Sequence, residues 1–123
     1  MFYEAENIER VGRHEVQYSI VNLGRDKEFS KLMDFELPQL EESLIARFTP
    51  QNVMLKHYLY KKMDRYYLAV ECELAQKKLA YNVLINDSGP AFVIQAPQQE
   101  YSLLSGKRIK ETLFDITVQH FDT

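Results

Sequence analysis

Residues 52–85 decide the fold, and they read NVMLKHYLYKKMDRYYLAVECELAQKKLAYNVLI. Apolar side chains alternate with polar ones, which predicts three antiparallel strands joined by turns at residues 62–65 and 75–78. All paired side chains then share one apolar face, and a slip of one residue would turn that face to water. The pairs expected across the two turns are Lys61 with Tyr66, Leu59 with Leu68, His57 with Val70, Leu55 with Cys72 and Val53 with Leu74, then Leu74 with Leu79, Cys72 with Tyr81, Val70 with Val83 and Leu68 with Ile85.

A helix is the alternative for residues 66–84, and the sequence leaves it open. Five residues recur there at steps of four and three, and good helix formers stand between them. Strands are preferred because the alternation is strict over residues 66–74 and because both turns give the same buried face. The five residues are Leu68, Cys72, Ala75, Leu79 and Val83.

The segment before this meander predicts a strand followed by a helix. Apolar and polar residues alternate over residues 14–23, which indicates a strand that Gly24 ends. Over residues 26–48 an apolar stripe recurs at steps of four and three, which indicates a helix that begins near Asp26. Pro38 breaks the helical backbone, so this helix is expected to be kinked or doubled.

The segment after the meander predicts a turn, a strand and a second helix. Residues 86–90 combine Asn, Asp, Gly and Pro, the residue types that favour a reversal, and residues 91–95 offer a fourth strand. Residues 98–106 are expected to form a loop. Residues 109–120 fit a C-terminal helix, although residues 114–120 also alternate like a strand. The sequence therefore predicts an α+β domain, with an antiparallel sheet of an N-terminal strand plus a three- to four-strand meander.

Composition and charge limit the classes of protein to which the chain can belong. The 123 residues suit one domain, residues 1–123, and the content of 46% hydrophobic and 27% charged residues is that of a globular chain. There is one cysteine, and the sequence begins with no secretion signal and contains no apolar run of membrane-spanning length. A soluble, cytoplasmic protein without a membrane partner is therefore expected. The net charge of −3 disfavours nucleic acid as a partner.

No residue pattern in the chain indicates catalysis, a metal or a cofactor. His14, His57 and His120 lie far apart in the sequence, so they offer no zinc-binding spacing. Cys72 falls on the apolar face, where a thiol behaves as a small hydrophobic group. Glu71 lies opposite Lys56 in the predicted register, which favours a surface ion pair over acid–base chemistry. We therefore predict no enzyme, no catalytic residues, no metal site and no cofactor.

The polar face of the meander is the predicted site, because it interleaves bases with aromatics. Its simplest interpretation is structural, with Tyr60 directly opposite Tyr67 beneath a covering element. The functional hypothesis is a non-enzymatic protein-binding domain, such as an adaptor, inhibitor or dedicated chaperone, whose partner is another protein or a second copy in a homodimer. The alternatives are a small-ligand domain with a pocket lined by Tyr and Phe, then an enzyme or a single-stranded nucleic-acid binder. The predicted binding residues are Lys56, Tyr58, Tyr60, Lys62 and Tyr67.

Overall fold

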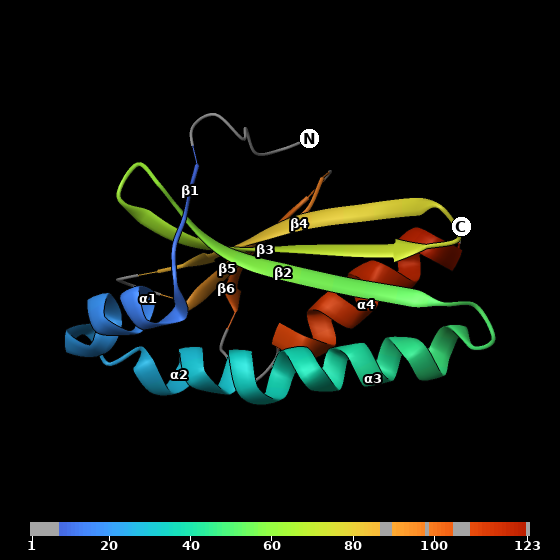
Figure 1. Cartoon of the computed structure of the whole chain (residues 1–123), viewed down its shortest axis with the longest axis horizontal. Helices are drawn as coiled ribbons and strands as arrows, with labels where there is room; N and C mark the ends of the chain where they lie inside the picture. The colour runs from blue at the N-terminus through green and yellow to red at the C-terminus, as the bar shows by residue number, and fades with distance from the viewer. Residues whose placement is uncertain (1–7, 87–89, 98, 105–108, 123) are drawn as a thin grey trace.

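A computed structural model describes residues 8–86, 90–97, 99–104 and 109–122. Within these residues one six-stranded antiparallel sheet has its strands in sequence order, and the helices lie on one side of it (Figure 1). The strands are β1 Glu9–Arg10, β2 Val53–Lys62, β3 Arg65–Leu74, β4 Lys77–Ile85, β5 Phe92–Gln95 and β6 Glu100–Leu104. The helical segments are α1 Arg13–Ile20, η2 Val21–Leu23, α2 Asp26–Lys31, η3 Leu32–Glu36, α3 Leu37–Phe48 and α4 Ile109–Asp122. This arrangement confirms the predicted α+β fold.

The meander of β2, β3 and β4 confirms the strand interpretation, and the helical alternative for residues 66–84 is wrong. Every pair predicted between β2 and β3 is present, from Lys61 with Tyr66 to Val53 with Leu74. The predicted register between β3 and β4 is wrong by two residues, since Leu74 lies opposite Lys77 and Cys72 opposite Leu79. A shift of two residues keeps each side chain on its face, so the predicted apolar face survives the correction.

The length of the second turn explains that shift. Ala75 and Gln76 alone form the turn, and both have positive φ, at 52° and 68°. Met63 and Asp64 do the same in the first turn, with φ of 52° and 62°. Two positive-φ residues make a type I′ turn, whose twist matches that of the strands, so a two-residue loop replaces the expected four-residue one.

The strand predicted over residues 14–23 is wrong, because this segment forms α1 and the short 3₁₀ turn η2. Val16 and Ile20 are four residues apart and both are buried, so they share one helical face. Tyr18, between them, is 76% exposed. The alternating pattern therefore combined one buried helical stripe with one solvent-facing tyrosine. The N-terminal strand of the sheet is β1, which precedes this helix.

The helix predicted over residues 26–48 is present and is divided by a π-helical turn, η3, between α2 and α3. Pro38 is the second residue of α3 and directly follows the π turn, so the hydrogen bond that its missing N–H cannot make is lost where the helix is already widened. The wider π turn lets the apolar stripe continue through the proline. Phe29, Leu40 and Leu44 of this stripe are fully buried against the sheet. The expectation of a kinked or doubled helix is confirmed.

At the C-terminal side, β5 and the helix α4 confirm the predictions, whereas the loop expected over residues 98–106 is wrong. Strand β6 occupies part of it and pairs with β5. Residues 87–89 of the predicted turn and residues 98, 105 and 106 of the predicted loop lie outside the described residues. A backbone hydrogen bond connects the two sides of the turn, since the Asn86 N–H donates to the Ala91 carbonyl at 2.9 Å.

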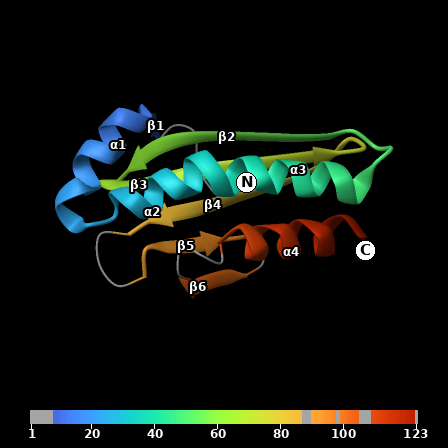
Figure 2. The same cartoon turned by 90° about the horizontal axis from the view of Figure 1, so that it is seen from below.

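Helix α4 returns beneath the sheet and lies beside α3, parallel to it (Figure 2). Near the start of α4, the Lys110 ammonium donates to the Gln39 side chain at 3.4 Å. Near its end, Arg47 forms an ion pair with Asp122. Phe48 and Phe121 add an edge-to-face contact with ring centres 6.1 Å apart. The two helices thus close the main core over the central strands, between the sheet and the helical layer.

Candidate functional site

The sheet face opposite the helices, called here the outer face, carries the predicted site. Because side chains alternate along a strand, the apolar partners of the core use one face and the even-numbered residues of β2 use the other. A second, smaller apolar cluster forms on the outer face around Tyr60 and Ala69, and Ile8 from the segment before β1 packs against it. No helical residue takes part in this cluster within the described chain.

The structure brings the three predicted tyrosines together as one unit, called here the tyrosine cluster: Tyr58, Tyr60 and Tyr67. Tyr60 and Tyr67 are stacked across β2 and β3, with ring centres 5.0 Å apart and planes 10° apart. Tyr58 lies next to Tyr60 with a centre-to-centre distance of 5.9 Å. Such packing fixes the rings in place without a covering helix. The predicted pairing of Tyr60 with Tyr67 is therefore confirmed.

The three tyrosines differ in how much of each ring reaches solvent. Tyr60 is 1% exposed, so it supports the cluster from within. Its hydroxyl donates to Oδ1 of Asn82 at 2.8 Å, and burial raises its pKa, with smaller contributions from Tyr67 and Tyr58. Tyr58 and Tyr67 are half-buried and present the accessible part of the cluster.

Positive charges border the tyrosine cluster. The guanidinium of Arg10 in β1 lies over the Tyr58 ring, 4.2 Å from its centre, in a cation–π arrangement. Of the predicted lysines, Lys56 is exposed and Lys62 is half-buried on the same strand. Lys56 lies opposite Glu71 and Met54 opposite Glu73, as the predicted register requires. The basic character is therefore strongest toward the β2–β3 turn, and acidic groups accompany it toward the other end of the strands.

Sequence reasoning missed Arg10 and Asn82, which complete this surface. Arg10 belongs to a two-residue strand in a segment with no clear period. Asn82 stands among apolar residues of β4, and its role depends on a bond that crosses the neighbouring strand. A polar residue inside an apolar run was the one signal for Asn82, because a buried amide needs a partner. Nothing in the local sequence indicates Arg10.

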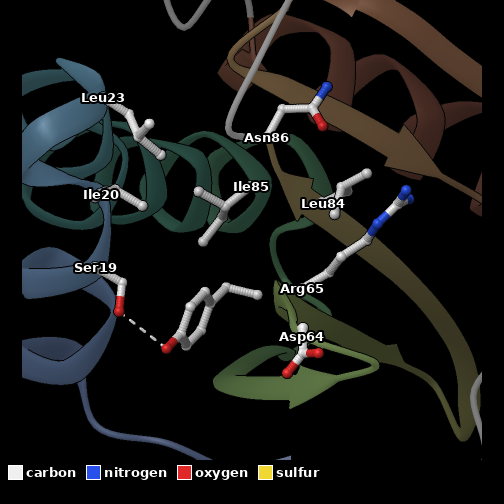
Figure 3. Close-up of a pocket in the computed structure, with 9 residues that line it drawn as sticks. Ser19, Ile20, Leu23, Asp64, Arg65, Leu84, Ile85 and Asn86 are labelled. Atoms are coloured by element: carbon white, nitrogen blue, oxygen red, sulfur yellow. Dashed lines mark hydrogen bonds between the residues drawn. The ribbon is translucent and has the colours of Figure 1, made fainter.

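A cavity of about 270 Å³ lies where α1, the β2–β3 turn and the end of β4 meet (Figure 3). The Ser19 and Tyr66 hydroxyls are hydrogen-bonded there at 3.0 Å. It is not the pocket lined by Tyr and Phe that the sequence suggested, since Tyr66 is its only aromatic residue among those described. The prediction of a strand over residues 14–23 concealed this site, because Ser19 reaches it from a helix. The lining residues are Ser19, Ile20, Leu23, Asp64, Arg65, Tyr66, Leu84, Ile85 and Asn86.

The residues considered for catalysis are not assembled into a site in the part of the chain described. His14 lies on α1, His57 on β2 and His120 on α4. Cys72 is buried, and this burial raises the pKa of its thiol to about 11, so it stays protonated and unreactive. No group of three or more His, Cys, Asp or Glu side chains among the described residues could hold a metal ion.

Comparisons with protein-family models, with curated proteins and with solved structures returned no match. Among the described helices, none has both the length and the apolar character that crossing a membrane requires. The candidate site is therefore defined by its own residues, which form a fixed aromatic and basic surface on one face of a sheet.

Proposed function

We propose that the chain is a non-enzymatic protein-binding domain, of the adaptor, inhibitor or dedicated-chaperone type, that contacts its partner through the outer face. The observation that carries this proposal is the tyrosine cluster, in which buried Tyr60 holds the half-exposed rings of Tyr58 and Tyr67. Tyrosine and arginine are the residue types that most often anchor protein interfaces. Rings that are fixed before binding lose little conformational entropy when a partner arrives.

The charges around the cluster indicate what the partner carries. Arg10 over Tyr58 and Lys62 at the end of β2 offer positive charge beside apolar ring surface. A protein surface with apolar side chains next to Asp or Glu complements this arrangement. Nucleic acid is a poorer match, because Glu71 and Glu73 lie on the same face and a phosphate backbone rewards many positive contacts.

The test compares two purified variants with the natural chain as baits for proteins of the source cell, with quantification by mass spectrometry. Tyr58→Ser with Tyr67→Ser removes the accessible rings, and Tyr18→Ser removes a more exposed ring from α1 on the other side of the sheet. A true partner is retained by Tyr18→Ser and falls at least about 30-fold with the double variant, the scale of interface anchors. If no captured protein distinguishes the two variants, the outer face is not the binding surface.

Binding of a small ligand is a second candidate, and the cavity beside Ser19 and Tyr66 is the observation that favours it. Apolar residues from α1 and β4 line it together with hydroxyl and amide groups, the mixture found in ligand sites. The chain contains no tryptophan, so Leu23→Trp both narrows the cavity and adds a single fluorescent reporter. Native mass spectrometry should show a bound molecule on the natural protein that the variant lacks. An identical mass excess on both would exclude this cavity.

A further inference from the structure

One edge of the sheet is left open along most of β2. Strand β1 pairs with Tyr60 and Lys61 only, and the last contact on that side is the Val11 N–H donating to the Leu59 carbonyl at 3.0 Å. Backbone groups of successive residues point to opposite sides, so those of residues 53, 55 and 57 point the same way as Leu59, toward the open side. Residues 53–57 are called here the open edge. No described strand pairs with it.

Apart from the single lysine Lys56, the open edge has none of the features that usually prevent a strand from pairing with another chain. Strand β2 is ten residues long and contains no proline. Its register with β3 is continuous from Val53 to Lys62, without a bulge. Lys56 is its one permanently charged side chain between residues 53 and 57. A strand of this kind is a template for a further strand.

Apolar side chains are exposed above and below the open edge. Met54 on the outer face is 49% exposed, and Ile45 of α3 on the helical side is 45% exposed. Glu41 of α3 lies close enough to influence the charge of His57. Ile45 lies one helical turn, about 6 Å, beyond Glu41 along α3. Leu55 lies two residues, about 6.6 Å, before His57 along β2. Because α3 and β2 run in opposite directions (Figure 1), the two steps lead the same way. Ile45 is therefore on the part of α3 that lies nearest to Leu55, to within about one helical turn.

We propose that a second copy of this chain occupies the open edge, with the two β2 strands antiparallel about a two-fold axis at Leu55. In this register Leu55 pairs with Leu55 of the second copy, and Val53 pairs with its His57. All of these residues direct their backbone groups outward, so each pair exchanges both hydrogen bonds. The axis also brings Ile45 toward Ile45 of the second copy, which covers exposed apolar surface in the helical layer.

Steric and charge arguments select this register and favour an identical partner. A shift toward the β2–β3 turn would place the second copy against Leu59, whose carbonyl already accepts from Val11, and would set Lys56 opposite Lys56. A shift the other way shortens the paired stretch. In the proposed register Lys56 faces Met54 of the second copy, and no like charges meet. The edge is thus complementary to itself at its backbone, at its apolar side chains and at its charge.

The dimer would join two sheets into one continuous sheet and place two outer faces side by side. Two tyrosine clusters would then be offered to a partner from one surface. The dimer itself does not depend on the proposed function, because it is measured on the purified chain alone.

Cysteine cross-linking tests the register. Residues opposite each other in a hydrogen-bonded antiparallel pair have Cα atoms about 5.5 Å apart, within the range of a disulfide. Because Cys72 lies opposite Leu55 on β3 and would compete by forming a disulfide within one chain, the cysteine variants are made in a Cys72→Ala background. In that background Leu55→Cys should give a covalent dimer on mild oxidation. His57→Cys is the matched control, since the proposed register separates the two copies of residue 57 by about 13 Å along the strand direction alone. Cross-linking of His57→Cys with none of Leu55→Cys would overturn the register.

A charge pair at residue 54 separates association from folding. Met54→Lys would face Lys56 of the second copy and raise the dimer dissociation constant roughly 2- to 30-fold, whereas Met54→Glu would lower it by a similar factor. Within one chain residue 54 lies opposite Glu73, so the effects on monomer stability have the opposite signs. The variant that folds more stably should dimerise more weakly.

Sedimentation measurements across the micromolar range give the dimer dissociation constant, and thermal unfolding gives the stability of the fold. A concentration-dependent dimer with opposite shifts for the two residue-54 variants supports the proposal. A natural chain that stays monomeric throughout overturns it, as does a dissociation constant that moves in the same direction for both variants. Either result leaves the outer-face proposal to its own capture test.

Discussion

The Tyr60 hydroxyl on β2 donates a 2.8 Å hydrogen bond to Oδ1 of Asn82 on β4, and β3 runs between them. Both residues are buried on the outer face. Ala69 of β3 lies opposite Asn82 and is also buried, and its small side chain leaves room for the tyrosine ring to cross. One side-chain bond thus ties two non-adjacent strands together and fixes the ring on which the tyrosine cluster is built.

Replacing Tyr60 by Phe should destabilise the fold. The ring stays, but the buried Asn82 oxygen loses its donor, and an unsatisfied buried polar atom costs about 1–3 kcal/mol. Urea unfolding of the variant should show a lower midpoint with an unchanged slope. Tyr18→Phe, on the exposed side of α1, is the control and should change stability by less than about 0.5 kcal/mol. Equal stability of the two variants would mean that the Tyr60–Asn82 bond contributes nothing.

Replacing Tyr81 by Phe should have the opposite effect. Tyr81 is fully buried, and burial raises its pKa while the nearby Thr117 hydroxyl lowers it to a smaller extent. The Tyr81 hydroxyl nevertheless makes no hydrogen bond of good geometry among the described residues. The neighbouring Thr117 hydroxyl donates instead to the Leu113 carbonyl at 2.7 Å. Removing an unsatisfied hydroxyl should leave stability unchanged or raise it by about 1 kcal/mol, as measured by urea unfolding. A loss above about 1 kcal/mol would show that the Tyr81 hydroxyl is satisfied.

Most of the sheet could be predicted because its side-chain pattern and its pairing depend on each other. The β2–β3 register followed from alternation and from one short turn, and a one-residue error would have exposed the core. The β3–β4 register could not be fixed in this way, because a two-residue shift preserves the buried face. Ala75 and Gln76 lack the Asn-Gly signature of a type I′ turn, so the local sequence gave no reason to prefer the shorter loop.

The region around α1 could not be predicted, because two periods coincide there. Val16, Tyr18 and Ile20 satisfy a strand pattern, while Val16 and Ile20 also satisfy a helical one. Only packing decides between them, through burial of two of the three side chains. The same error concealed the cavity at Ser19. The candidate residues of the outer face were foreseen as a group, but the burial of Tyr60 depends on contacts with Asn82 and Ile8 from distant segments.

The stability of the protein should depend on pH through His57. Partial desolvation lowers the pKa of His57 in the folded chain, although the residue remains exposed at the sheet edge, and Glu41 partly opposes this by raising it. The unfolded chain therefore takes up the proton first as the pH falls below about 6.5. The contribution of neutral His57 is present above that pH and is lost as the pH falls toward the lowered folded value. As the pH is lowered from about 7.5 to 5.5, the urea midpoint of unfolding should decrease less for His57→Gln than for the natural chain.

Glu41→Gln is the matched variant for that measurement. Without the carboxylate, nothing on α3 opposes the effect of burial, so the folded pKa of His57 should decrease further. The loss of stability on acidification should then be larger than in the natural chain, opposite in sign to the effect of His57→Gln. A shallower pH dependence for Glu41→Gln would contradict the assignment of Glu41 as the group that favours the protonated imidazole.

The second hairpin turn should be the easiest place to stabilise the fold. Ala75 and Gln76 hold φ at 52° and 68°, a region that costs a residue with a Cβ roughly 1–2 kcal/mol. Ala75→Asn with Gln76→Gly supplies the pair that type I′ turns prefer and leaves both strands unchanged. We expect the free energy of unfolding to rise by about 1 kcal/mol in urea denaturation.

Ala75→Val provides the opposite test at the same turn. A β-branched side chain is worse than alanine at positive φ, so this variant should unfold at a lower urea concentration. The direction of the stability change also distinguishes the two-residue loop of the structure from the four-residue loop expected from the sequence. A four-residue loop gives no reason for both Ala75 and Gln76 to have positive φ. If Asn-Gly lowered stability while Val raised it, the β3–β4 register, and with it the place of Leu79 opposite Cys72, would have to be abandoned.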